Sequence, residues 1–210
     1  KGVNAEPLLS FPSGALVHFA VSSSQVKMST KLDGYKTTFL PFNLGHGGAS
    51  GNPLNPNGHQ TSYLWETVWQ RDSLLEIIGR YMVNERDEKK HISKVIFPRF
   101  HQLDATRKLQ AAILEEGPGK KYLIQHSAGS GKTNSIAWSA HFLADLHDQQ
   151  DSKVFDSVIV VSDRNVIDSQ LQEVIDSFER NAGVVATIKS GSGSKSAQLA
   201  EALSGDKKVV

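Results

Sequence analysis

The sequence predicts an α/β fold with a mixed β/α N-terminal part and a C-terminal half built on parallel strands. Short apolar or alternating runs separated by turn residues fill the first 60 positions, whereas strand-like and helix-like segments alternate from about residue 100 onward. The chain has 210 residues, of which 39% are hydrophobic and 21% are charged. A chain of this length and composition can bury a real core and forms one large domain or two small ones.

Charge and cysteine usage exclude several classes of protein. The 23 Lys and Arg residues almost balance the 22 Asp and Glu residues, so no overall field attracts nucleic acid or an anionic membrane, and any polyanion site must be local. The absence of Cys excludes disulfides and thiolate metal sites, and the eight His residues show no ligand spacing. The longest aliphatic run, 158–161, is far shorter than the ~20 apolar residues that span a bilayer, so no membrane segment is expected.

The first 60 residues are predicted to form an antiparallel meander. Three runs, 15–21, 25–32 and 37–42, are apolar or alternating and are separated by Ser, Gly and Asp residues. Residues 45–58 are rich in Gly, Asn and Pro, which predicts a surface loop or a connector between layers. Apolar residues at helical spacing follow over 62–83 and predict helix there.

A dense run of charge separates the two halves of the chain. Residues 84–94 carry few large apolar side chains, which is typical of an interdomain linker or of an exposed helix end. We divide the chain into a domain 1–83, a linker 84–99 and a domain 100–210. Six basic residues in and after this run have two possible roles. They either contact the phosphate backbone of a nucleic acid, or they form a solvated surface, because acidic residues interrupt the run. They are Lys89, Lys90, Lys94, Arg99, Arg107 and Lys108.

From residue 100 the chain alternates between helices and strands in the manner of βαβ units, which place their strands in a parallel sheet. The predicted helices are 101–116, 132–147, 165–179 and about 195–204, and the predicted strands are 121–126, 156–162 and 183–188. The last residues look like the opening of a further strand. Because the chain also begins without Met, we expect it to be an internal segment of a longer polypeptide.

One motif carries the chemistry. A predicted strand runs into a Gly-rich turn that ends in Gly-Lys-Thr and opens a helix, which is the context that a phosphate-binding P-loop requires. The turn is Ser127-Ala128-Gly129-Ser130-Gly131-Lys132-Thr133. Its backbone N–H groups and the helix N-terminus would bind the phosphates of ATP, Lys132 would reach the β- and γ-phosphates, and Thr133 would ligate Mg²⁺. His126 stands where the loosest form of the motif has its first Gly, but the strand before and the helix after disfavour a Gly-rich turn without function.

Two further residues are candidates for ligand contacts. Gln102, near the start of a predicted helix, carries both a donor and an acceptor that suit an adenine edge, although a lone Gln is about as often solvated. Arg164 follows a strand whose polar C-terminal end is where open α/β sheets place ligands. Arg164 either contacts a nucleic-acid phosphate or stays solvated beside a helix cap formed by Ser162 or Asp163.

Several other aromatic and histidine side chains are of types that can bind ligands. Trp65, Trp69 and Phe97 are candidates for stacking on bases, but core packing is expected for them. His46 and His59 lie in the Gly-rich loop region without partners, and no metal is assigned to them.

The order of these motifs resembles that of superfamily 2 helicase-type ATPases. Gln102 with the two residues before it is similar to the Q motif, 125–133 to motif I, and 160–164 to motif Ia. Segments of the first half resemble the region that joins the nuclease domain to the first motor domain in the R subunit of type I restriction endonucleases. These segments are 16–21, 28–32, 39–43, 51–53 and 63–66. Motif I is common to many ATPases, whereas its combination with the upstream segments is more selective, and the resemblance covers nearly the whole chain.

The resemblance implies a truncated RecA-like motor domain over 100–210 and the end of a restriction-type nuclease domain over 1–83. The implied activity is ATP-dependent translocation along double-stranded DNA with DNA cleavage, in the bacterial or archaeal cytoplasm, in a complex with methyltransferase and specificity subunits. The acid pair of the ATPase is expected after Val210 and the nuclease residues before Lys1. No catalytic set is therefore complete, and the segment is expected to bind nucleotide without turning it over.

Two alternatives stay open at this point. The chain is either part of the restriction subunit or part of another superfamily 2 helicase that acts on DNA or RNA. The more distant alternative is a non-motor P-loop protein, which would bind nucleotide without any dependence on nucleic acid.

Overall fold

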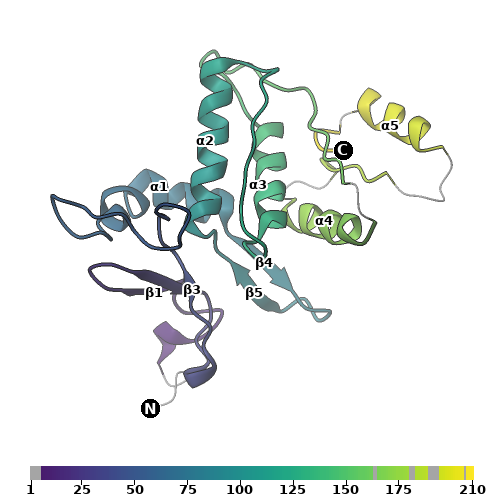
Figure 1. The fold of residues 1–210 in the computed structure, drawn as a ribbon. Coiled ribbons are helices and arrows are strands. Elements are labelled where there is room, and N and C mark those ends of the chain that lie inside the picture. The colour runs from purple at the N-terminus through teal and green to yellow at the C-terminus, as the bar shows by residue number, and fades with distance from the viewer. Residues whose placement is uncertain (1–5, 163–164, 180–182, 189–193, 206) are drawn as a thin grey trace. The chain divides into compact units, whose positions relative to one another are not determined.

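The computed structural model describes residues 6–162, 165–179, 183–188, 194–205 and 207–210. The chain divides into two compact units, Lys1–Leu103 and Asp104–Val210, which are described one at a time below. The strands belong to the first unit, and the helices that follow the Gly-rich turn belong to the second (Figure 1). The described residues form a mixed α/β structure with small antiparallel sheets, as the sequence predicts at this coarse level.

The first unit contains a three-stranded antiparallel sheet in the order β1-β2-β3. Its strands are β1 (His18–Val21), β2 (Val26–Ser29) and β3 (Leu40–Pro41). Val26 and Met28 point to the same side of the central strand and are 0% and 2% exposed, because alternate residues of a strand share a face. The predicted meander is confirmed, with strands shorter than the apolar runs. Two 3-10 turns, η2 (Pro7–Leu9) and η3 (Gly34–Lys36), lie outside the sheet.

Three short helical segments account for the helical spacing over 62–83. They are the π-helical η4 (Leu64–Val68), α1 (Arg71–Glu76) and the π-helical η5 (Ile77–Tyr81). Leu64, Val68, Ile77 and Tyr81 are all fully buried and form a core face, whereas Leu75 and Ile78 are 57% and 42% exposed.

An aromatic cluster lies at the centre of this core. The ring of Phe42 lies 5.4 Å from that of Phe19, 6.2 Å from that of Phe97 and 5.9 Å from that of Phe100, measured between centroids. Tyr63 joins the cluster, and its hydroxyl donates a 2.5 Å hydrogen bond to the carbonyl oxygen of Phe42. Burial raises the pKa of Tyr63 to about 12, against a smaller lowering by a hydrogen bond from Asn52.

Two Asn side chains tie the Gly-rich loop to the sheet. Asn43 Oδ1 accepts hydrogen bonds from the backbone N–H of Val26 at 2.8 Å and from Asn52 Nδ2 at 3.0 Å. Asn43 Nδ2 donates to the carbonyl of Ser50 at 2.8 Å, and Asn52 Oδ1 accepts from the backbone N–H of Leu44 at 2.8 Å. We call Asn43 and Asn52 the asparagine clasp. The bond between these two side chains joins the segments 39–43 and 51–53 to each other.

The expected linker 84–99 is largely an antiparallel hairpin, which corrects the interpretation of its charge run. Its strands are β4 (Val83–Arg86) and β5 (Ile92–Ile96). The charged residues lie mostly at the turn, where Asp87 Oδ1 accepts a 2.9 Å hydrogen bond from the backbone N–H of His91. A solvated turn tip favours the same residue types as a linker, so composition alone does not separate the two. The division into domains at these positions stays a prediction.

Four helices were predicted after residue 100, and all four are present. They are α2 (Phe100–Glu116), α3 (Lys132–Ala144), α4 (Asn165–Phe178) and α5 (Lys195–Ser204). Gly117 follows α2 with φ of 78°, the left-handed conformation that commonly ends a helix. No helix in the described ranges is both long and apolar enough to cross a membrane.

The predicted strands of the second unit appear only as isolated parallel bridges. Val209 bridges Val158 on one side and Val185 on the other, and both pairs are parallel. The predicted strand 121–126 forms no bridge within the described part of the chain, and Leu123 there is 90% exposed. A parallel strand needs neighbours for its backbone groups, so the apolar run alone does not make it a strand. The described residues therefore show parallel pairing but not a complete parallel sheet.

Candidate functional site

The Gly-rich turn leads the chain directly onto the N-terminus of α3. Gly129 has φ of 70° and Gly131 has φ of 80°, and both values lie in the left-handed region that glycine adopts at low cost. Gly131 is the residue immediately before the helix. A Cβ placed on Gly129 meets no atom within 4 Å, so glycine is needed here for backbone conformation and not for lack of space. The turn thus has the open side that a bound anion requires.

Lys132 folds its side chain back over this turn. Its Nζ donates hydrogen bonds to the carbonyl oxygens of Ser127 at 2.8 Å and of His126 at 3.2 Å. The Lys132 side chain is exposed, so its ammonium stays accessible to solvent while two backbone carbonyls hold it beside the turn. A phosphate oxygen can replace these carbonyls as the acceptor, because an anion is a stronger partner for an ammonium than a neutral carbonyl.

The first turn of α3 adds the other groups that a phosphate and a divalent cation need. Thr133 is half-buried at the second position of the helix. The helix N-terminus carries roughly half a positive charge, which favours an anion beside it. Ser135, on the same turn, is 5% exposed, and its Oγ has no hydrogen-bond partner among the described residues. The donor set therefore fits a phosphate with a hydroxyl-ligated Mg²⁺.

Packing against α4 fixes the position of α3. Trp138 is 1% exposed and its ring lies 5.3 Å from that of Phe178. His141 Nε2 lies 2.9 Å from the carbonyl oxygen of Ile175, in the last turn of α4, and donates to it when that nitrogen carries the proton. Sequence reasoning missed His141, because a lone His at a helical position gives no signal of a contact with a carbonyl 34 residues away.

Gln102 is held in the first turn of α2. Its side chain is 3% exposed, and its Oε1 accepts a 2.8 Å hydrogen bond from the backbone N–H of Arg99. This is the backward hydrogen bond of a helix cap, which satisfies one of the N–H groups that a helix start leaves unpaired. The solvated alternative for Gln102 is therefore wrong, whereas its contact with adenine stays a prediction. Gln102 belongs to the first compact unit and the Gly-rich turn to the second.

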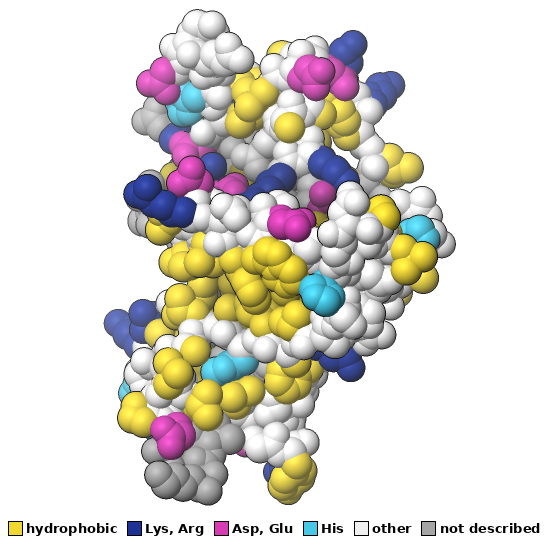
Figure 2. Space-filling view, turned by 90° about the vertical axis from the view of Figure 1, so that its left-hand side faces the viewer, with side chains coloured by type: hydrophobic (Ala, Val, Ile, Leu, Met, Phe, Trp, Pro, Cys, Tyr) yellow, Lys and Arg dark blue, Asp and Glu magenta, His cyan; other side chains and the backbone are white. Residues whose placement is uncertain are grey.

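The basic candidates for nucleic-acid contact include residues that acidic side chains pair with. Arg164 lies outside the described residues. Two of the basic residues in the zone that starts at Lys89 form ion pairs: Lys94 with Glu85 at 3.2 Å and Lys108 with Asp104 at 2.7 Å. On the face drawn in Figure 2, Lys and Arg side chains lie among Asp and Glu side chains. This pattern favours the solvated-face interpretation.

The aromatic candidates divide between core and surface. Phe97 is 5% exposed, as core packing predicts, but Trp65 and Trp69 are 43% and 39% exposed. Trp69 still packs against Phe19, with ring centroids 5.4 Å apart. No group of three or more His, Cys, Asp or Glu residues within the described ranges is placed to hold a metal ion, and His46 and His59 belong to none.

Comparison with protein families gives a match for the second half of the chain. The model of the SWI2/SNF2 ATPase family matches residues 101–210, just over half of the chain. Searches of curated proteins and of solved structures gave no significant match. The matched range starts at the Gln102 segment and contains the whole Gly-rich turn and α3. The match supports a superfamily 2 helicase-type ATPase, and the chain belongs to the SWI2/SNF2 ATPase family.

Proposed function

We propose that the chain binds ATP with Mg²⁺ at the turn formed by residues 127–133. The observation that carries this proposal is the pair of left-handed glycines that delivers Lys132 and Thr133 to the start of α3, in a chain of an ATPase family. The backbone of the turn would hold the phosphates, and Lys132 would exchange its two carbonyl acceptors for phosphate oxygens. Thr133 would ligate Mg²⁺, which supplies positive charge beside the phosphates when bound.

As part of the same proposal, Gln102 would hydrogen-bond to the adenine base of the bound ATP. Its amide is already fixed by the bond from Arg99, so only its remaining donor and acceptor capacity is available to a base edge. Fixing the side chain in advance lowers the entropy lost on binding. The predicted RecA-like sheet belongs to the proposal as well, and the parallel bridges of Val209 with Val158 and Val185 support it.

At a finer level, we propose that the chain is part of the DNA-translocating and DNA-cleaving subunit of a type I restriction enzyme. The motif order and the restriction-like segments of the first half support this, together with the asparagine clasp that links two of those segments. Double-stranded DNA and the methyltransferase and specificity subunits are the proposed partners. The family match favours a helicase-type motor over a non-motor P-loop protein, and another superfamily 2 motor is the second candidate.

The nucleotide proposal is tested by titrating ATP·Mg²⁺ against wild type and Lys132→Ala. Loss of a charged hydrogen-bond donor costs about 1.5–3 kcal/mol, so we expect about a 10- to 100-fold weaker affinity for the variant. Lys120→Ala is the matched control, because Lys120 is an exposed Lys of the same unit outside the turn, and it should bind like wild type. Equal affinity of wild type and Lys132→Ala would refute the proposed site.

The restriction proposal needs a separate experiment. Pull-down of the full-length protein from its native host should co-purify a DNA methyltransferase subunit, and its ATPase should be stimulated by double-stranded DNA without strand separation. Strand separation, or stimulation by RNA, would assign the chain to another superfamily 2 motor and leave the nucleotide site unaffected.

A further inference from the structure

One buried hydroxyl next to the Gly-rich turn lacks a hydrogen-bond partner among the described residues. Ser135 lies in the first turn of α3 and is 5% exposed, and its Oγ makes no hydrogen bond there. A Ser in a helix often donates to the carbonyl four residues back, but here the Gly131 carbonyl accepts the backbone N–H of Ser135, at 3.3 Å, and not its hydroxyl. Because a buried polar group without a partner costs free energy, this hydroxyl is a candidate for a bond that forms only when the site is occupied.

The direction of helical side chains brings the Ser135 hydroxyl toward the turn. In an α-helix the Cα–Cβ bonds tilt toward the N-terminus, so a side chain covers the stretch of chain about one helical turn before it. For Ser135 this stretch is Gly131 with the end of the Gly-rich turn. Lys132 and Ile136, at the same end of the helix, are exposed, whereas Ser135 is buried, so its hydroxyl lies on the inner side of the helix start. The polar groups that precede it along the chain on this side are backbone groups of the turn.

A phosphate bound in the turn gives this hydroxyl an acceptor. The N–H and C=O groups of a trans peptide point in opposite directions, so when backbone N–H groups converge on an anion, carbonyl oxygens of the turn point away from it. Two carbonyls beside the turn, those of Ser127 and His126, accept from Lys132 Nζ at 2.8 and 3.2 Å. A phosphate draws the ammonium away from them, because an anion is the stronger acceptor. The occupied turn therefore needs new donors for its carbonyl oxygens, and Ser135 carries a buried donor.

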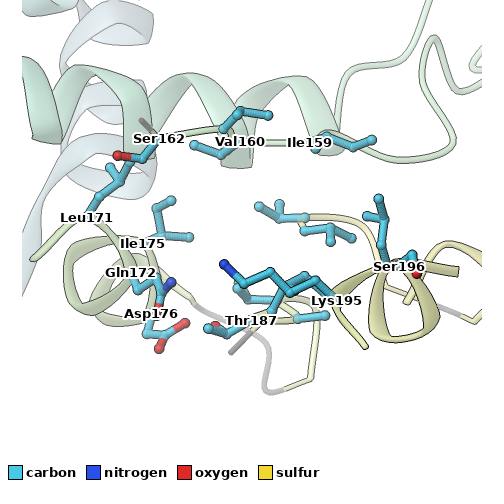
Figure 3. A pocket seen from close by; sticks show the side chains of 17 residues that line it. Ile159, Val160, Ser162, Leu171, Gln172, Ile175, Asp176, Thr187, Lys195 and Ser196 are labelled. Carbon is cyan, nitrogen blue, oxygen red and sulfur yellow. The ribbon is translucent and has the colours of Figure 1, made fainter. Parts of the chain in front are cut away.

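A cavity elsewhere in the same unit does not provide a partner for Ser135. This cavity has a volume of about 330 Å³ and is lined by α4, α5 and the segments 159–162, 185–188 and 209–210 (Figure 3). Neither Ser135 nor any residue of the Gly-rich turn belongs to its walls. A molecule in this cavity would therefore leave the Ser135 hydroxyl as it is, whereas a phosphate in the turn would change its surroundings.

We propose that Ser135 is a positioning residue of the nucleotide site, whose hydroxyl donates to a carbonyl oxygen of the Gly-rich turn only when phosphate occupies the turn. This inference rests on the proposed function, because it needs a phosphate in the turn. A hydrogen bond that is present in the occupied site and absent from the empty one adds to the affinity for nucleotide and not to the stability of the empty protein. Ser135 acts through the turn and does not touch the nucleotide.

The test measures nucleotide affinity and thermal unfolding of Ser135→Ala side by side with wild type. We expect ATP·Mg²⁺ to bind about 3- to 10-fold more weakly to the variant, the equivalent of one hydrogen bond. ADP·Mg²⁺ should lose affinity by the same factor, since Ser135 acts through the turn and not on the γ-phosphate. Without nucleotide the variant should unfold at the same temperature as wild type or at a higher one, because Ala removes a buried hydroxyl that has no partner there and favours helix.

Ser139→Ala is the matched control, because Ser139 is a half-buried Ser one helical turn further along α3, and it should bind both nucleotides like wild type. The proposal is overturned if Ser135→Ala keeps its ATP affinity, loses affinity for ATP but not for ADP, or unfolds at a lower temperature without nucleotide. It is also overturned if Ser139→Ala loses as much affinity. Lys132→Ala separates the two proposals: if it binds weakly while Ser135→Ala binds like wild type, the nucleotide site stands and the role of Ser135 falls. If wild type binds no nucleotide, both fall.

Discussion

In the first unit the asparagine clasp joins polar side chains to each other and to backbone groups, whereas in the second unit the Lys132 side chain beside the Gly-rich turn is exposed to solvent. Asn43 Oδ1 accepts two hydrogen bonds inside the unit, and one of its donors, the Val26 N–H, belongs to a residue that is 0% exposed. The ammonium of Lys132, by contrast, donates to the carbonyl oxygens of His126 and Ser127 beside the open turn. An anion can replace these neutral carbonyls as the acceptor. We expect residues of the first kind to act on stability and those of the second kind to act on ligand binding.

Replacing Asn43 by Ala should give the largest change in stability. The variant leaves the buried Val26 N–H without its 2.8 Å acceptor and removes the bond from Asn52. We expect the free energy of unfolding of the first unit to fall by about 3 kcal/mol, since each buried group left unpaired costs about 1–3 kcal/mol.

Denaturant titration followed by tryptophan fluorescence measures this effect. Asn57→Ala is the control, because Asn57 is an exposed loop residue whose backbone N–H, which the substitution keeps, donates to Asn55 Oδ1. ATP affinity should be the same in Asn43→Ala as in wild type. A loss of nucleotide affinity without loss of stability would contradict the assignment of the clasp to structure.

Tyr63 provides an intermediate effect that depends on pH. Burial raises its pKa from 10.0 to about 12, so the folded state keeps a proton that the unfolded state loses in this range. The stabilisation is complete below pH 10 and is lost as the pH rises from about 10 to about 12. The loss should amount to about 2 kcal/mol relative to Tyr63→Phe, which has no proton to lose there. Urea unfolding of wild type and Tyr63→Phe between about pH 10 and pH 12 measures the free energy of unfolding at each pH. If this free energy changes with pH in the same way in both proteins, the interpretation is wrong.

Gly129→Ala should give the smallest effect on stability. A non-glycine residue in the left-handed region costs about 1 kcal/mol, and the added Cβ meets nothing within 4 Å, so no clash adds to this. Thermal unfolding measures the change. Gly14→Ala is the comparison, because its Cβ would lie 2.4 Å from the carbonyl oxygen of Leu8, and it should destabilise the chain more. Equal effects of the two variants would contradict the role given to backbone conformation at Gly129.

Elements that follow from local sequence pattern were predicted well. The antiparallel meander and the four helices from α2 to α5 occur where periodicity and turn residues place them. The Gly-rich turn before α3 was also found, because Gly, Lys and Thr at that spacing have few other uses. The predicted roles of Lys132, Thr133 and Gln102 toward ATP are not tested by the geometry itself.

Features that depend on how backbone segments pair or approach each other were missed. The β4–β5 hairpin was interpreted as a linker because charge at a turn and charge in a linker look alike in one sequence. The capping bond of Gln102 and the contact of His141 with Ile175 depend on backbone geometry that residue spacing does not encode. The segment 121–126 has the composition of a strand, yet strand formation needs a neighbour to pair with.

The position of Val209 between two other segments has a mechanical consequence. The carbonyl of Lys208 accepts from the Val158 N–H at 2.8 Å, and the carbonyl of Val209 accepts from the Ala186 N–H at 2.8 Å. Residues 208–210 therefore link two segments, 158–160 and 184–186, that these hydrogen bonds do not join directly to each other. A substitution that distorts the backbone at Val209 should therefore loosen both neighbouring segments at once.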